Sequence, residues 1–292
     1  MDIIDLTMPL YDYLVSCRRA LHQIPELHFE LPETTAFVAA QLDAMEIPYE
    51  VIENGGIVAL IGKKDAEKTF LLRADMDALP LHEESGEPFA SHNGRMHACG
   101  HDLHTSMLLG AARELKKREK TLPGAVKLVF QSNEEGIAGM EVLIRHGLME
   151  NPKVSAALAL HVFPGSQMPI GTYSNLPGPA NSSVDEYKIE IHGKGAHGAM
   201  PYKGIDPINV GVHIYTALLA MMAKEIDARE TAVLSNGYFL GGNPVSYNII
   251  PASAVMGGGI RTLSNDIAAY IKERLKDIAE STAGAFQAGC TV

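Results

Sequence analysis

The chain has 292 residues, and 24 lysines and arginines against 35 aspartates and glutamates give it a formal net charge of −11. Apolar residues make up 46% and charged residues 20%, a globular composition that excludes disordered, collagen-like and coiled-coil proteins. The acidic balance argues against a nucleic-acid partner, and the most apolar run, residues 214–223, is too short to span a bilayer. We therefore expect a globular protein of one large domain or two domains, with neither nucleic acid nor membrane as a partner.

The cysteines indicate a compartment. Cys17, Cys99 and Cys290 are odd in number and far apart, and no secretory signal opens the chain. This pattern predicts free thiols in a reducing cytoplasm.

The first half alternates helical and strand-like patterns. The predicted elements are helices over residues 10–23 and 33–45, strands over 56–61 and 69–73, a helix over 102–117, a strand over 124–131, a helix over 139–146 and a strand over 156–162. Such alternation predicts an α/β domain with a mainly parallel sheet and helices on both of its faces.

The second half begins after a stretch rich in proline, glycine and serine at residues 176–183, which predicts a linker and a domain boundary between residues 181 and 182. The elements predicted beyond it are a strand over 186–192, a glycine-rich loop over 193–198, a helix over 207–226, strands over 232–240 and 246–261, and a helix over 265–283. This order lacks one strand of a split-βαβ, ferredoxin-like α+β unit, and residues 287–292 can begin that strand.

Metal-ligating side chains gather at the predicted strand ends, the edge at which active sites form in open α/β sheets. Asp75 and Asp77 lie two residues apart, so an extended backbone points them the same way. Glu134 and Glu135 follow a strand directly, and a cation that neutralises one leaves the other to act as a base. A solvated turn is the alternative for each pair, and His161, inside an apolar strand, fits a core histidine as well as a ligand.

A second polar cluster precedes the helix at residues 102–117. Cys99 and His101 offer a thiolate and an imidazole, and we expect the helix dipole to lower the pKa of the thiol. Asp102 either caps the helix or fixes the tautomer of a ligating histidine, and His104 is either structural or functional. A mixed set of sulfur, nitrogen and oxygen ligands suits zinc, or manganese where carboxylates dominate, and predicts a hydrolytic metal site.

Eight motifs extend through the chain: residues 18–22 (RRALH), 25–27 (PEL), 73–80 (RADMDALP), 96–105 (MHACGHDLHT), 130–131 (FQ), 134–136 (EEG), 160–162 (LHV) and 193–201 (GKGAHGAMP). In this order they resemble the amidohydrolase branch of the metal-dependent aminoacylase/carboxypeptidase family. That branch includes N-acyl-amino-acid, hippurate and auxin-conjugate hydrolases and N-acetyldiaminopimelate deacetylases. The resemblance implies a metal-dependent hydrolase that cleaves the amide bond of N-acyl amino acids or related conjugates with an activated water.

The resemblance also implies roles for single residues. Glu134 falls on the general base, and Asp77 on the catalytic aspartate that orients the site from behind. Asp75 stands where related branches have a metal-binding histidine. The ligands of two divalent ions, zinc or manganese, fall on Cys99, His101, Glu135 and His161.

The resemblance assigns residues 1–181 to a catalytic domain and residues 182–292 to a lid domain through which the protein forms a homodimer. In the lid, His197 matches a histidine that reaches across the dimer to the substrate carbonyl. Asn248 and Arg261 match residues that hold the substrate carboxylate.

Two departures from the family leave alternatives open. The residues before Glu134 are Phe-Gln-Ser-Asn, where Pro-Ala or Pro-Thr is usual. The family's C-terminal return segment, with a last histidine ligand, has no counterpart, so we expect a catalytic domain without that segment and a lid incomplete at its last strand. The alternatives are a non-catalytic dimeric fragment or binding module with an incomplete metal site, and a cysteine hydrolase that uses Cys99.

Overall fold

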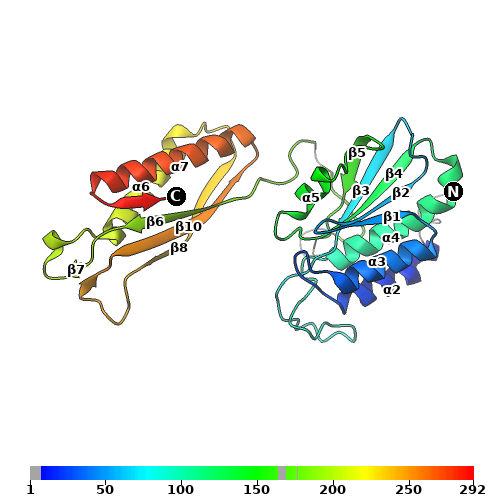
Figure 1. Cartoon of the computed structure of the whole chain (residues 1–292), viewed down its shortest axis with the longest axis horizontal. Helices are drawn as coiled ribbons and strands as arrows, with labels where there is room; N and C mark the ends of the chain where they lie inside the picture. The colour runs from blue at the N-terminus through cyan, green and yellow to red at the C-terminus, as the bar shows by residue number, and fades with distance from the viewer. Residues whose placement is uncertain (1–7, 164–168, 176) are drawn as a thin grey trace. The chain divides into compact units, whose positions relative to one another are not determined.

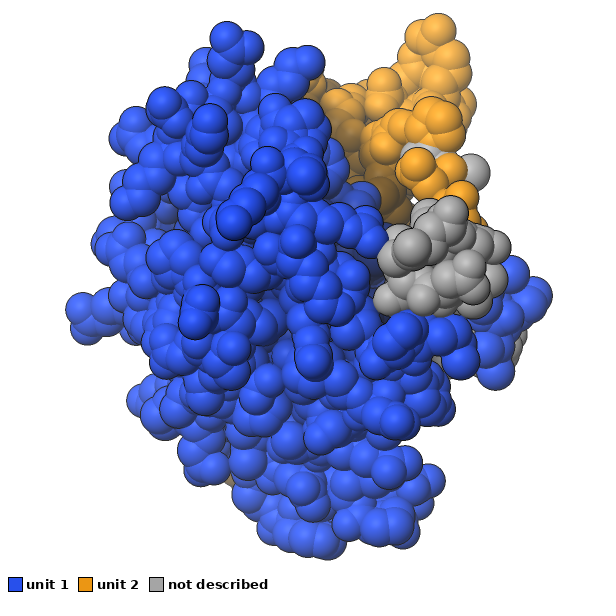
Figure 2. Space-filling model, turned by 90° about the vertical axis from the view of Figure 1, so that its right-hand side faces the viewer, with its two compact units in different colours: residues 1–172 blue, residues 173–292 orange. Residues whose placement is uncertain are grey.

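The computed structural model describes residues 8–163, 169–175 and 177–292. The chain divides into two compact units, residues 1–172 and 173–292, coloured blue and orange in Figure 2. None of the helices in the described ranges combines the length and the apolar character needed to cross a membrane.

Unit 1 is a mixed α/β unit with a five-stranded sheet of order β1-β2-β4-β3-β5. Its elements are η1 (Met8–Leu10), α2 (Tyr11–His22), α3 (Pro32–Ala44), β1 (Tyr49–Ile52), β2 (Gly56–Ile61), β3 (Thr69–Asp75), α4 (His101–Lys117), η2 (Glu119–Thr121), β4 (Ala125–Gln131), α5 (Gly139–Arg145) and β5 (Val154–Ala159).

The expectation of a mainly parallel sheet is wrong for half of this sheet. Strand β3 runs parallel to β4 and β5, but β2 is antiparallel to both β4 and β1. The short link between β1 and β2, residues 53–55, explains why that pair is antiparallel, because parallel strands need a long crossover whereas a hairpin needs only a tight turn.

Helices cover both faces of the sheet (Figure 1). Helices α2, α3 and α4 bury Val38, Leu42 and Leu109 against Ile57 and Phe130, and α5 packs on the opposite face. Each fully buried aliphatic side chain contributes about 1.5–3 kcal/mol, so these contacts hold the strand ends in place. The edge strand β5 differs from the others, because five of its six residues are exposed.

Unit 2 has a four-stranded antiparallel sheet of order β11-β6-β10-β8, with α6 and α7 packed on one face (Figure 1). Its elements are β6 (Asp185–His192), β7 (Ala196–His197), η3 (Pro201–Lys203), α6 (Pro207–Glu225), β8 (Ala232–Gly241), β9 (Ile249–Ile250), β10 (Ser253–Thr262), α7 (Asn265–Ala285) and β11 (Gly289–Thr291). The order β6-α6-β8-β10-α7-β11 is a split-βαβ arrangement. The short strand β11 pairs with β6 and supplies the strand expected within residues 287–292.

Candidate metal centre

The polar cluster of unit 1 is built at the ends of parallel neighbours β3 and β4. Asp75 is the last residue of β3, Asp77 follows two residues later, and both are almost completely buried. Glu134 and Glu135 follow β4, which ends at Gln131. Because parallel strands end at the same edge of a sheet, the fold brings these carboxylates together.

Asp77 organises this edge through three hydrogen bonds. Its two carboxylate oxygens accept from the backbone N–H groups of Glu134 (3.0 Å) and Glu135 (3.1 Å). Its backbone carbonyl accepts from Nδ1 of His101, at 2.8 Å. One buried residue therefore fixes the main chain of the glutamate pair and the orientation of the imidazole.

The other ring nitrogen of His101 is left free to bind a cation. Since Nδ1 carries the proton, Nε2 holds a lone pair, and this buried atom has no hydrogen-bond partner within the described residues. It lies 3.8 Å from Oδ2 of Asp75 and 3.9 Å from a carboxylate oxygen of both Glu134 and Glu135. An unpartnered lone pair among carboxylates is costly alone and fits a divalent cation.

Cys99 and His161 extend the cluster. Nδ1 of His161 donates to the carbonyl of Val162 (2.8 Å), so the lone pair of Nε2 is available, and Nε2 lies 3.4 Å from Sγ of Cys99. Three groups of side chains within the described residues have possible ligand atoms that lie within 4.8 Å of one another. They are Cys99 with His101 and His161, His101 with Glu134 and Glu135, and Asp75 with His101 and His104. The sequence predicted His161 inside a strand, but in the structure it lies beyond the end of β5.

The electrostatics also fit a bound cation. Burial, reinforced by the Glu135 carboxylate, raises the pKa of the Cys99 thiol to about 12. The expectation of a lowered thiol pKa is therefore wrong, because burial and this carboxylate outweigh the helix dipole. A coordinated cation inverts this balance and deprotonates the thiol. Burial likewise raises the pKa of Glu134, against the opposing effect of His101.

His104 is fully engaged within the protein. Nδ1 donates to Oδ1 of Asp75 (2.6 Å), and Nε2 accepts from the N–H of Val162 (3.0 Å). Burial alone would raise the pKa of Asp75, but His104, His101 and Arg73 outweigh it and hold that pKa at about 2. Asp75 and His104 therefore form a hydrogen-bonded pair behind the candidate ligands, in which His104 has its proton on Nδ1.

A buried network next to the cluster was missed at the sequence level. Oδ2 of Asp102 lies 2.8 Å from Nε of Arg18 and 2.7 Å from Nδ1 of His22, whose Nε2 lies 3.0 Å from Oε1 of Glu83. Asp102 thus takes neither predicted role, since α4 has Gly100 as its N-cap residue and Asp77 sets the tautomer of His101. The motif at residues 18–22 carried the only sequence signal for this network.

Burial would raise the pKa of Glu83, but hydrogen bonds from Ser85, Ser91 and His22 hold it at about 2. The hydrogen bond to Asp102 raises the pKa of His22, although burial opposes the shift. The network therefore resembles a chain of ion pairs among its four residues rather than a metal site.

In unit 2, two of the three predicted substrate-binding residues lie side by side. His197 of β7 pairs with Ile249 of β9, and the carbonyl of Asn248 accepts from the N–H of Gly198 at 2.7 Å. Nδ1 of His197 accepts from the N–H of Ala199, which places the ring proton on the other nitrogen. Arg261 is not on this ribbon; it is exposed on β10, opposite Val233 of β8.

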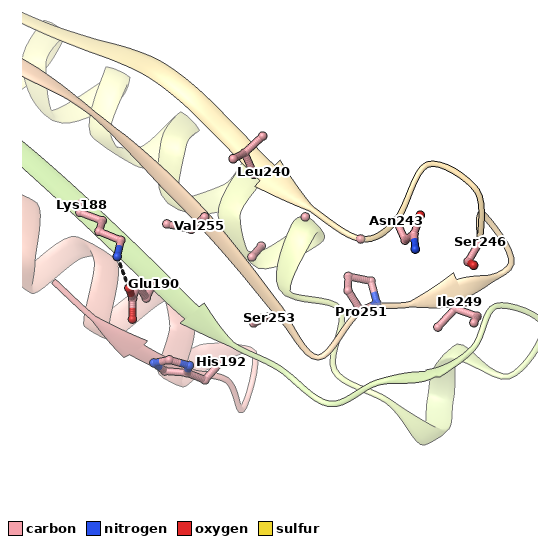
Figure 3. Close-up of a pocket in the computed structure, with 13 residues that line it drawn as sticks. Lys188, Glu190, His192, Leu240, Asn243, Ser246, Ile249, Pro251, Ser253 and Val255 are labelled. Carbon is pink, nitrogen blue, oxygen red and sulfur yellow. Dashed lines mark ion pairs between the residues drawn. The ribbon is translucent and has the colours of Figure 1, made fainter.

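A cavity of about 730 Å³ lies on unit 2 among β6, β8, β10 and the loop before β9 (Figure 3). Leu240, Ile249, Pro251 and Val255 give it an apolar wall, and Lys188 and Glu190 form an ion pair along it. The candidate metal ligands are in unit 1 and do not line this cavity. Ile249 belongs both to the cavity and to the ribbon that carries His197.

The fold and the cluster together are those of a metallopeptidase-type hydrolase family. Residues 71–284 match the model of peptidase family M20/M25/M40, and the chain belongs to this family. An N-acetyl-L-cysteine deacetylase of Bacillus subtilis is 38% identical over 94% of this chain and 65% of its own length. The IAA-amino acid hydrolase ILR1-like 4 of Arabidopsis thaliana is 37% identical over 97% of this chain and 63% of its own length.

Among solved structures, the YXEP protein of Bacillus subtilis, described as a dinuclear metal-binding peptidase of the M20 family, is similar with a TM-score of 0.80 and 33% identity. The match covers 97% of this chain and 73% of that one. The chain thus spans slightly less than two thirds of the length of the first two relatives.

Proposed function

We propose that this protein is a metal-dependent amidohydrolase that cleaves the amide bond of N-acyl amino acids or related conjugates. The observation that carries the proposal is the arrangement around Asp77, which holds the Glu134–Glu135 turn and the His101 ring at one strand edge. Relatives named as a deacetylase of N-acetyl-L-cysteine and as a hydrolase of an amino acid conjugate support the substrate class.

Cys99, His101, Glu135 and His161 would hold two divalent ions, zinc or manganese, and the dinuclear description of the similar solved structure supports that number. When bound, such ions lower the pKa of a water molecule and polarise the amide carbonyl.

Glu134 would take the proton from the attacking water and deliver it to the leaving amine. Burial raises the pKa of Glu134, and a higher pKa makes its carboxylate a stronger proton acceptor. Asp77 keeps this carboxylate in place through the Glu134 backbone N–H, so it acts as a positioning residue.

Residues of unit 2 would bind the substrate. The backbone N–H of Ala199 leaves the remaining ring nitrogen of His197 as an N–H donor, which can stabilise the oxyanion that forms at the amide carbon. We assign the substrate carboxylate to Asn248 and to Arg261, whose guanidinium can form two parallel hydrogen bonds. In this proposal residues 1–181 form the catalytic domain, residues 182–292 form the lid, and His197 acts across a homodimer.

Two features of unit 2 support the dimer: an exposed apolar stripe on α6 and an open edge of the sheet. Helix α6 has an exposed apolar stripe at helical spacing, formed by Ile208, Val212, Tyr215 and Leu219. Such a stripe is typical of a helix that packs against another protein surface. Strand β8 lies at the sheet edge, where its free backbone groups can pair with a second chain. We expect Val212→Glu to yield monomers by sedimentation velocity and Ala220→Glu, an exposed site off the stripe, to leave dimers. A monomeric wild-type protein would contradict this assignment.

The experiment that tests the function is a panel of N-acyl amino acids offered to the zinc- or manganese-loaded protein. We expect hydrolysis of at least one member, and Glu134→Gln should lower the rate by about 10²–10⁴-fold with unchanged metal content. Stoichiometric metal without turnover would favour the non-catalytic alternative. Activity that survives chelators but not thiol alkylation would favour the cysteine hydrolase, which the raised pKa of Cys99 already disfavours.

Free thiols at all three cysteines support a cytoplasmic location.

A further inference from the structure

The proposed ligand His161 stands on weakly supported backbone. It lies two residues past the end of β5, which is the edge strand of the unit 1 sheet, and its own side chain is exposed. An edge strand has hydrogen-bonded neighbours on one side only, so a loop that extends from it has few backbone contacts to hold it. A metal ligand at such a place needs a specific anchor if its geometry is to be set before the ion binds.

The structure supplies this anchor through His104. The ring is only 3% exposed and lies in α4, with Nε2 accepting the backbone N–H of Val162, the residue after His161. Nδ1 donates to the Asp75 side chain at the end of β3, and this fixes the tautomer that leaves Nε2 as the acceptor. The imidazole thus joins the centre of the sheet to the loop that follows its edge.

Two further contacts complete the connection. The carbonyl of Val162 accepts from Nδ1 of His161, so the residue that His104 anchors also orients the ligand ring. On the other side of the loop, the Val162 side chain packs against Gly100, where an added Cβ would lie 2.5 Å from a Val162 methyl group. Gly100 has a φ of 85°, a conformation that favours glycine.

We propose that His104, oriented by Asp75, is a positioning residue that sets His161 for the ion it shares with Cys99 and is not itself a metal ligand. Both ring nitrogens of His104 already have partners, although the ring lies close enough to Asp75 and His101 for the three to resemble a metal set. A ligand role would require breaking the bond to Val162 or to Asp75. This inference rests on the proposed metal site.

The test uses variants that separate the two hydrogen bonds from the volume of the ring. His104→Phe keeps a ring and removes both bonds, whereas His104→Gln keeps an acceptor that can reach the Val162 N–H. In calorimetric zinc titrations we expect His104→Phe to bind two ions, one of them about 10- to 100-fold more weakly. We expect His104→Gln to recover most of that affinity. Unchanged affinity in His104→Phe, or loss of one ion at every zinc concentration, would overturn the proposal.

A second measurement requires no variant, so it decides the matter even if His104→Phe does not fold. Nitrogen-15 NMR of the wild-type imidazoles should show the Nδ1–H tautomer for His104 in the metal-free protein. After zinc is added, the Nε2 resonances of His101 and His161 should move and that of His104 should stay. A metal-induced shift at Nε2 of His104, or the other tautomer in the metal-free state, would refute the positioning role. If the protein binds no metal, the proposed function fails while the metal-free spectrum still tests the anchor.

Discussion

The two histidines of α4 in unit 1 and His197 in unit 2 are presented in opposite ways. In unit 1, His101 and His104 are buried, and backbone or carboxylate partners assign the proton of each ring. In unit 2, His197 is exposed, and among the residues that the structure describes only one of its nitrogens has a partner, the N–H of Ala199. The first pair is organised by the fold of its own unit, whereas His197 has a free donor that a ligand can approach.

This difference separates preorganisation from recognition. A buried, hydrogen-bonded cluster is costly to disturb, because each lost partner leaves a polar group buried without compensation. An exposed histidine can change with little effect on folding, so its contribution should appear in turnover alone. Three substitutions test this contrast, beginning with the largest effect.

His197→Ala should lower turnover of the best substrate by about 10²–10³-fold, because it removes a donor to the developing oxyanion. Zinc affinity and the free energy of unfolding should match those of the wild type, because the side chain is exposed. His197→Gln, which keeps an N–H donor, should retain more activity. Weaker zinc binding in His197→Ala would show that His197 also supports the metal site, and it would contradict this contrast between the units.

Asp77→Asn should lower the free energy of unfolding of the metal-free protein by about 1–3 kcal/mol, because its NH₂ group would face a backbone N–H of Glu134 or Glu135. Denaturant unfolding measures the change. The matched control is Asp206→Asn at the start of α6, where one side-chain oxygen accepts both backbone bonds and asparagine caps as well. Equal effects at the two sites would contradict the role of Asp77.

Glu83→Gln should have the smallest effect, and it should depend on pH. The folded-state pKa of Glu83 is about 2, below its ordinary value of 4.5, so the carboxylate stabilises the fold above pH 4.5. That contribution is lost as pH falls from 4.5 through 2. Unfolding curves of wild type and variant should therefore differ at neutral pH and converge near pH 2. A constant difference across this range would exclude a titrating Glu83.

The sequence predicted which residues meet, and it was less successful with what holds them. The resemblance of the motifs assigned Cys99, His101, Glu135 and His161 as metal ligands, which stays a prediction, and the parallel strands β3 and β4 bring the strand-end carboxylates together. The role of Asp102 was not predictable, because its partner His22 lies 80 residues earlier in the chain. The prediction of a lowered pKa for the Cys99 thiol was wrong for a similar reason. Burial, and a carboxylate that lies far away along the chain, have no local sequence signal.

The fold shows the same division between local and long-range information. Helices and strands with strong periodicity were found, but β1, with only four residues, was missed, and with it the antiparallel half of the sheet. Strand β5 was extended by three residues, because its apolar pattern continues through Leu160 and Val162 although its strand pairing ends at Ala159. Strand limits depend on neighbours that a local pattern does not contain.

The three bonds of Asp77 have a consequence for how the site can diverge. The two carboxylate oxygens of Asp77 accept from main-chain N–H groups, and substitution of Glu134 or Glu135 leaves these groups in place. The need for an aspartate at this position is therefore independent of the side chains around it. The proposed ligand positions Cys99 and His161 can therefore be exchanged to favour a softer or a harder ion while the supporting main chain stays unchanged. We therefore expect metal preference to change through substitution of the proposed ligands, while Asp77 and its main-chain hydrogen bonds are retained.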